Sequence, residues 1–165
     1  MKLIDILREI GDPKTPSKPY DLELYSDSDY ALIYTFETDA DNQYKIVFGK
    51  NDKEIRDPQT PRYSDTELEY SVAFGVIPDS GGLDFEAELK DTRNLFRVMA
   101  TIILAIKEAI EEAEKPVTRL IIEPTKRDSR DKRRYNLYKT YIEKHMPPGW
   151  SVTKDDGDLI ELERD

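Results

Sequence analysis

A long apolar helix pattern between two strand patterns constrains the fold of this chain more than any other feature. Apolar side chains recur at helical spacing through residues 92–114, the most apolar segment of the sequence. Thr92 is a suitable N-cap, and Pro116 prevents the helix from continuing. Strand patterns precede it at residues 67–76 and follow it at 117–122. Because a helix connects these strands, we expect a parallel pair with a right-handed crossover.

Three shorter strands are predicted ahead of this unit, at residues 20–25, 30–36 and 44–48. In the first, Tyr20, Leu22 and Leu24 are expected to share one face. The connections are too short for crossovers, so these strands should form an antiparallel meander. Residues 49–65 contain a glycine, two prolines and many charges, and are predicted to form a long loop.

The C-terminal part is predicted to contain a helix and a closing strand pair. Asp128 or Ser129 caps a helix that continues to about His145, and strands follow at residues 150–153 and 159–162. His145 is expected to be exposed in the last helical turn, where a positive charge suits the helix dipole.

These elements predict one α+β domain over residues 1–165, with a mixed, mostly antiparallel sheet flanked by helices. Residues 1–10 carry apolar side chains at helical spacing and should form an N-terminal helix. Residues 11–19 contain three prolines and predict a stiff connector. Residues 20–165 then form the α+β body.

Composition excludes several kinds of site. The chain has no cysteine, which rules out thiolate catalysis, disulfides and cysteine-ligated metals. His145 is the one histidine, and no ligand cluster surrounds it, so we expect no metal site. No apolar run is long enough to span a membrane, and no signal peptide is recognisable. We therefore expect an intracellular protein without a membrane partner.

The negative charge of the chain is concentrated in its first part. The formal net charge is −10, of which residues 1–91 contribute −11 and residues 92–165 contribute +1. This balance disfavours nucleic-acid binding, which needs a basic face. It suits either solubility or a basic protein partner. Several tyrosines in the acidic part either pack across strands or form a protein-binding surface: Tyr25, Tyr30, Tyr34, Tyr44 and Tyr63.

Residues 126–134 form the strongest basic cluster, with six basic residues in nine. The cluster lies at the start of the helix that ends near His145, where positive charges oppose the helix dipole. It can bind a phosphate, a nucleic-acid backbone or an acidic partner, or it can remain a solvated face. The basic residues are Lys126, Arg127, Arg130, Lys132, Arg133 and Arg134.

The order of elements from residue 66 to 163 is similar to the second half of the GCN5-related N-acetyltransferase (GNAT) fold. In that family a strand leads into a helix that cradles acyl-coenzyme A, and a strand, a helix and two strands follow. The segments Arg134-Tyr135-Asn136-Leu137-Tyr138 and Pro148-Gly149-Trp150 resemble its Leu-Tyr and Gly-aromatic motifs. The resemblance implies that Tyr138 is a general acid, with Glu69 as a candidate base. From the residues alone, Tyr138 is better explained as an amphipathic packing residue with its polar tip at the surface.

The chain departs from that family where the phosphates of the cofactor would bind. Residues 86–95 contain no glycine, and Glu86, Glu88 and Asp91 are acidic. Carboxylates at a helix N-terminus compete with a bound phosphate. We therefore expect a degenerate GNAT-like scaffold that has lost the usual acyl-coenzyme A loop.

The chain also resembles small proteins of tailed bacteriophages, in its Met-Lys-Leu opening and its Asn94 to Thr101 segment. Together these features predict a phage-encoded protein-binding or structural protein, cytoplasmic in the host or virion-associated, with another protein or a second copy as partner. We expect no cofactor and favour a non-enzymatic role. The alternatives are a divergent N-acetyltransferase that uses acetyl-CoA, and nucleotide or nucleic-acid binding through residues 126–134.

Overall fold

The computed structural model describes residues 18–39, 41–54, 63–77, 95–122, 133–155 and 159–165. Within them the chain forms an α+β arrangement of two helices and a seven-stranded sheet. The elements are β1 (Glu23–Asp27), β2 (Ala31–Glu37), β3 (Gln43–Glu54), β4 (Tyr63–Val76), α2 (Leu95–Glu111), β5 (Val117–Ile122), α3 (Arg133–His145), β6 (Trp150–Asp155) and β7 (Ile160–Arg164).

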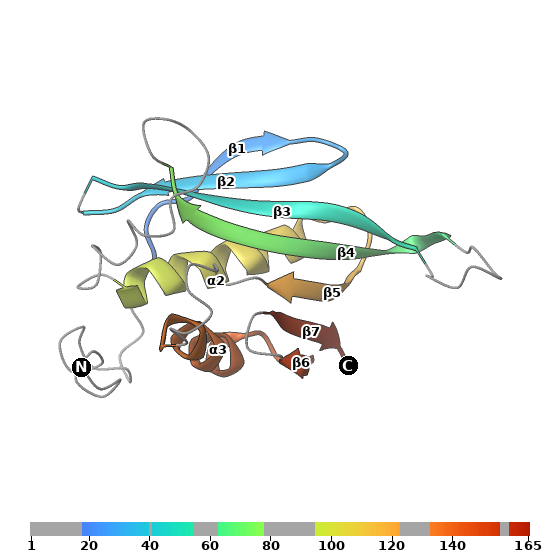
Figure 1. Ribbon diagram of the computed structural model, residues 1–165. Coiled ribbons are helices and arrows are strands. Elements are labelled where there is room, and N and C mark those ends of the chain that lie inside the picture. The colour runs from blue at the N-terminus through green and yellow to red at the C-terminus, as the bar shows by residue number, and fades with distance from the viewer. Residues whose placement is uncertain (1–17, 40, 55–62, 78–94, 123–132, 156–158) are drawn as a thin grey trace.

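The sheet has the strand order β1-β2-β3-β4-β5-β7-β6. β4 and β5 run parallel, and all the other neighbouring strands in the described residues are antiparallel. The predicted meander and the predicted parallel pair are therefore confirmed. The parallel pair follows from the length of α2, which carries the chain back across the sheet before β5 begins (Figure 1).

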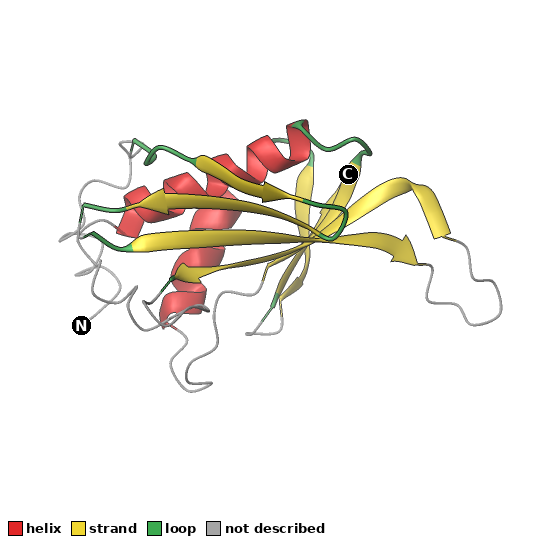
Figure 2. Cartoon of the chain, turned by 90° about the horizontal axis from the view of Figure 1, so that it is seen from above, coloured by secondary structure: helices red, strands yellow, loops and turns green. Residues whose placement is uncertain are grey.

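Both described helices lie on one face of the sheet (Figures 1 and 2). The side chains of the strands that point to this face alternate with those that point away. Ile46, Phe74 and Ile106 are fully buried between the sheet and α2, as are other residues at the expected periodicities. Burial of each such side chain stabilises the fold by roughly 1.5–3 kcal/mol. The prediction that α2 is the core helix is confirmed.

The loop predicted at residues 49–65 is wrong at both of its ends. β3 continues to Glu54 and β4 begins at Tyr63, so the two strands pair well beyond the predicted limits. This extension projects past the body of the sheet (Figure 1). It lacks the alternation of apolar and polar residues that marks a half-buried strand, because it has little core to cover. Residues 55–62 lie outside the described residues.

The first strand begins at Glu23 instead of residue 20. Tyr20 is buried just before it, where its backbone N–H donates to Thr101 Oγ1 of α2 at 2.8 Å. The Arg97 guanidinium lies 3.9 Å from the centroid of the Tyr20 ring, and its Nη1 is 3.1 Å from Asp39 Oδ2. These contacts anchor the chain to α2 before the strand starts.

A β-bulge inside β1 follows the three residues that were expected to share one face. The pairing with β2 shifts between Leu24 and Ser26. Tyr20 is buried and Leu22 packs against the core. Leu24 is 60% exposed, but it lies opposite buried Tyr34 and lines the same cavity as Tyr34, which agrees with the predicted shared face. An extra residue in one strand bends it and changes the direction of the side chains that follow.

His145 ends α3 as predicted, but it is half-buried and not exposed. Its ring centroid lies 4.2 Å from that of Tyr141. Burial lowers the pKa of His145, and the positive charges of Lys144 and Lys107 lower it further. The expectation of an exposed residue is therefore wrong. The N-terminal helix, the connector up to residue 17, and the caps at Thr92 and Asp128 or Ser129 lie outside the described residues.

Candidate functional site

Glu69, the candidate base, forms part of a charged cluster on the sheet. It lies on β4 and is only 8% exposed. Arg119, its partner in register on β5, places Nη1 3.3 Å from Glu69 Oε2 and Nη2 2.8 Å from Glu161 Oε2. The hydrogen bond to Glu161 is the main cause of a raised pKa for Arg119, and the charges of Glu69, Glu161 and Glu163 also raise it against the desolvation caused by burial. If Glu69 accepted a proton, as a catalytic base must, it would lose its ion pair with Arg119.

Tyr138, the candidate acid, lies on the opposite side of the sheet. It is 2% exposed, and its ring packs edge-on against Phe74 with the centroids 5.0 Å apart. Phe74 and Glu69 are five residues apart in a stretch of β4 that pairs regularly with β3, so their side chains point to opposite faces. Tyr138 therefore packs on the helix-covered face, and Glu69 lies on the other.

The structure thus does not bring the candidate acid and base together. An acetyl transfer would need both groups around one acyl-coenzyme A molecule, within hydrogen-bond reach of the reacting atoms. Glu69 and Tyr138, separated by the sheet, do not fit that cofactor as a pair. Residues 86–94, where the family binds the cofactor phosphates, lie outside the described residues.

Most of the basic cluster at residues 126–134 also lies outside the described residues. Arg133 and Arg134 form the first residues of α3 as it is described. The binding role of this cluster stays a prediction.

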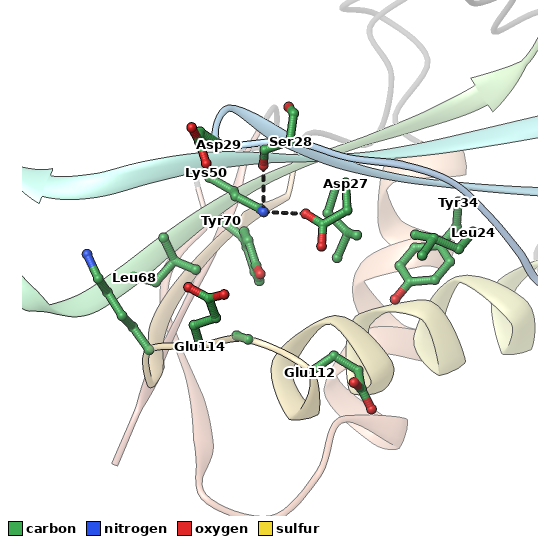
Figure 3. A pocket seen from close by; sticks show the side chains of 13 residues that line it. Leu24, Asp27, Ser28, Asp29, Tyr34, Lys50, Leu68, Tyr70, Glu112 and Glu114 are labelled. Carbon is green, nitrogen blue, oxygen red and sulfur yellow. Dashed lines mark hydrogen bonds and ion pairs between the residues drawn. The ribbon is translucent and has the colours of Figure 1, made fainter.

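A cavity of about 640 Å³ lies between the β1–β2 hairpin and the C-terminal end of α2 (Figure 3). Residues from four parts of the chain line it. They are Leu24, Asp27, Ser28, Asp29, Leu32, Tyr34, Lys50, Leu68, Tyr70, Glu112, Ala113, Glu114 and Lys115. We call this cavity the α2-end pocket. Sequence analysis did not identify it.

Lys50 on β3 holds the hairpin above the α2-end pocket. Its Nζ contacts Asp27 Oδ1 at 2.5 Å and the Ser28 carbonyl oxygen at 2.7 Å (Figure 3). Its backbone N–H donates to the carbonyl oxygen of Tyr30 at 2.9 Å. Ser28 Oγ accepts hydrogen bonds from the backbone N–H groups of Tyr30 and Ala31. The turn is therefore fixed both internally and against the centre of the sheet.

Two buried tyrosines, Tyr34 and Tyr70, reach the α2-end pocket from the sheet. They are 6% and 1% exposed, and their hydroxyl groups point into the cavity in Figure 3. In the part of the chain that the structure describes, neither hydroxyl makes a hydrogen bond, and neither oxygen is fully buried, so both are accessible from the cavity.

The electrostatics of the two tyrosines indicate a negative environment. Burial raises the pKa of Tyr70 to about 12, with further increases from the charge of Asp27 and from Tyr34. Burial likewise raises the pKa of Tyr34, and the charges of Glu108, Glu112 and Asp27 add to it. Both hydroxyl groups are therefore protonated at neutral pH.

Large apolar side chains are exposed beside the α2-end pocket. Among the described residues, those with high exposure are Leu24 at 60%, Tyr25 at 70% and Tyr30 at 84%. All three lie in the β1–β2 hairpin, and Leu24 also lines the pocket. We call these three residues the hairpin patch. Sequence analysis had named Tyr25 and Tyr30 as candidates for a protein-binding surface, whereas Tyr34 and Tyr44 are buried.

Comparisons with known proteins assign no family. No family model matches the chain, and no curated protein or solved structure is significantly similar to it. Within the described residues, neither α2 nor α3 has the length and apolar character that crossing a membrane requires. The same residues contain no group of three acidic or histidine side chains suited to a metal ion.

Proposed function

We propose that this chain binds another protein through the hairpin patch, on a degenerate acetyltransferase-like scaffold. The observation that carries the proposal is that three exposed large apolar side chains, those of Leu24, Tyr25 and Tyr30, belong to one hairpin. Exposed aromatic and apolar groups that gather at one place typically mark a protein interface.

The position of the hairpin at the sheet edge supports this function. Among the described strands, β1 pairs with β2 alone. A free strand edge offers backbone N–H and C=O groups to an extended segment of a partner. Such a segment would pair along β1 and cover the hairpin patch. The negative charge of residues 1–91 favours a basic partner.

The proposed origin and location of the protein come from its resemblance to small proteins of tailed bacteriophages. The proposal includes a phage origin and a cytoplasmic or virion-associated location for the protein. A second copy of the chain is the alternative partner, and it would meet the same edge strand. No chemical step is part of this function.

A photo-crosslinking experiment tests the proposal. A benzophenone amino acid replaces Tyr25 in one variant and Thr153, exposed on β6 at the other sheet edge, in a control. Both are expressed in the native host background. We expect a discrete protein adduct from position 25 that disappears when Leu24→Ser and Tyr30→Ser are added. No adduct at position 25, or the same adduct at position 153, would overturn the proposal.

A divergent N-acetyltransferase is the second candidate. Its support is the element order of β4, α2, β5, α3, β6 and β7, the order that the family resemblance implies. Calorimetric titration of the full chain with acetyl-CoA tests it. Saturable binding would favour this candidate over a purely protein-binding role, and the absence of heat would remove it. Any acid and base would then have to be a pair other than Tyr138 and Glu69.

A further inference from the structure

We infer that the α2-end pocket binds a lysine or arginine side chain of the partner that docks on the hairpin patch. This inference rests on the proposed function, because the partner segment on β1 supplies the basic side chain. Three features of the pocket support it: unpartnered hydroxyl groups, an excess of carboxylates, and an apolar side chain at its entrance.

The hydroxyl groups of Tyr34 and Tyr70 are available to a ligand in the cavity. Both side chains are more than nine-tenths buried, and both hydroxyls point into the cavity without a hydrogen bond among the described residues. A tyrosine hydroxyl can accept a hydrogen bond, and an ammonium or guanidinium group carries several donors. A basic side chain in the pocket would therefore donate to the free lone pairs of these two hydroxyl oxygens.

The charge of the pocket selects a cation over an anion. Its lining contains four carboxylates, those of Asp27, Asp29, Glu112 and Glu114, against two lysines. Lys50 and Asp27 are paired with each other, and Lys50 also contacts the Ser28 carbonyl oxygen. The carboxylates of Asp29, Glu112 and Glu114 then stand against Lys115, so the remaining balance is still negative. The C-terminal end of α2 adds partial negative charge.

Glu114 is the carboxylate best placed to meet the cation. Figure 3 shows it turned towards the side of the pocket that holds Tyr70. Within the described residues it forms no ion pair. A cation between Glu114 and the two tyrosine hydroxyls would make a charge-assisted hydrogen bond.

The entrance of the pocket suits a side chain that arrives from β1. Leu24 is exposed on β1 and also lines the cavity, so it joins the hairpin patch to the pocket. The methylene groups of lysine and arginine pack on apolar surface while their charged ends reach polar groups. A volume of about 640 Å³ leaves space for such a side chain together with part of its backbone.

Titration of the full chain by NMR tests the inference. The probes are N-acetyl-lysine N-methylamide, the arginine equivalent, and the neutral norleucine equivalent. We expect saturable shifts of backbone amides around Tyr34, Tyr70 and Ala113 with the two cationic probes. The norleucine probe should not change the chemical shifts of these amides. Equal shifts with all three probes, or no shifts with the cationic ones, would overturn the inference.

Paired variants separate the pocket from a general effect of charge. Glu114→Gln should weaken binding of the lysine probe about tenfold, the size expected from losing one charge-assisted hydrogen bond. Glu111→Gln removes the same charge from an exposed position at the end of α2 that does not line the pocket. It should leave the affinity nearly unchanged. Equal effects of the two variants would refute the inference.

The source of the cation and the proposed function are tested separately. Much tighter binding of spermidine than of the lysine probe would overturn a protein side chain as the occupant. Crosslinking at Tyr25 does not depend on Glu114, so a crosslink without probe binding would refute the pocket alone. Probe binding without a crosslink would refute the hairpin patch as a docking site, and with it the claim that the cation comes from a docked partner.

Discussion

The ammonium nitrogen of Lys50 on β3 lies 2.7 Å from the carbonyl oxygen of Ser28, in the turn between β1 and β2. The same nitrogen pairs with Asp27, so one side chain fixes the hairpin to the sheet. We expect Lys50→Met to lower the free energy of unfolding by about 1 kcal/mol, because the lysine is partly exposed and its ion pair is partly screened. Urea denaturation measures this change.

A matched control distinguishes this role from loss of any surface lysine. Lys139→Met removes a lysine from α3 whose ion pair with Glu143 spans 3.9 Å. It should change stability by only a few tenths of a kcal/mol. Lys50→Met should also accelerate hydrogen exchange at the amides of residues 28–31, which Lys139→Met should not do. Equal exchange in the two variants would show that Lys50 does not hold the turn.

The second prediction concerns Arg119, whose guanidinium lies between three glutamates on the sheet face opposite the two described helices. Arg119→Met would leave Glu69 and Glu161, both largely buried, without their cation. We expect a loss of about 2–4 kcal/mol in unfolding free energy, because partly desolvated carboxylates would then repel each other. Thermal and urea denaturation measure the loss.

Glu163→Gln is the control for this cluster. Its carboxylate is half-exposed and lies 3.9 Å from Arg119 Nε, so it contributes little. We expect the unfolding free energy of the Glu163→Gln variant to stay within about 0.5 kcal/mol of wild type. A loss from Glu163→Gln as large as that from Arg119→Met would contradict the conclusion that Glu69 and Glu161 are the main partners of Arg119.

The parts of the fold that carry regular apolar patterns were predictable from the sequence. α2 repeats its apolar side chains at helical spacing, and β5 is a short β-branched run, so the parallel pairing of β4 with β5 was predicted correctly. β1 was misplaced because Tyr20 continues the strand pattern but packs on α2 instead. The extension of β3 and β4 was missed because backbone pairing alone, without an apolar face, leaves no periodic pattern.

The site was harder to predict because it forms only when distant segments meet. The α2-end pocket combines the hairpin, β3, β4 and the segment after α2, and no short motif connects them. The separation of Glu69 from Tyr138 did have a sequence signal. Phe74 shares the apolar face of β4 with Tyr70, and Glu69 has the opposite parity, so a helix packed on that apolar face lies away from Glu69.

The third prediction uses the ionisation of Tyr70. Its pKa of about 12 in the folded protein exceeds the ordinary value of 10.0, so the unfolded chain loses the proton first as pH rises. This contribution to stability is complete below pH 10 and is lost as pH rises through about 12. Tyr70→Phe should therefore lose less stability than wild type between pH 9 and about pH 11. Tyr25→Phe, at an exposed position, should behave as wild type in the same urea titrations.

The last prediction concerns His145, which gives a single resolved signal because the chain has one histidine. Burial is the main cause of its lowered pKa, so its NMR titration midpoint should lie below the ordinary value of 6.5. The unfolded chain binds this proton first as pH falls, so stability should decrease from about pH 7 down through the folded pKa. Lys144→Gln and Lys107→Gln should each raise the midpoint, because each removes a nearby positive charge. A midpoint at or above 6.5 in the wild-type protein would contradict the buried position beside Tyr141.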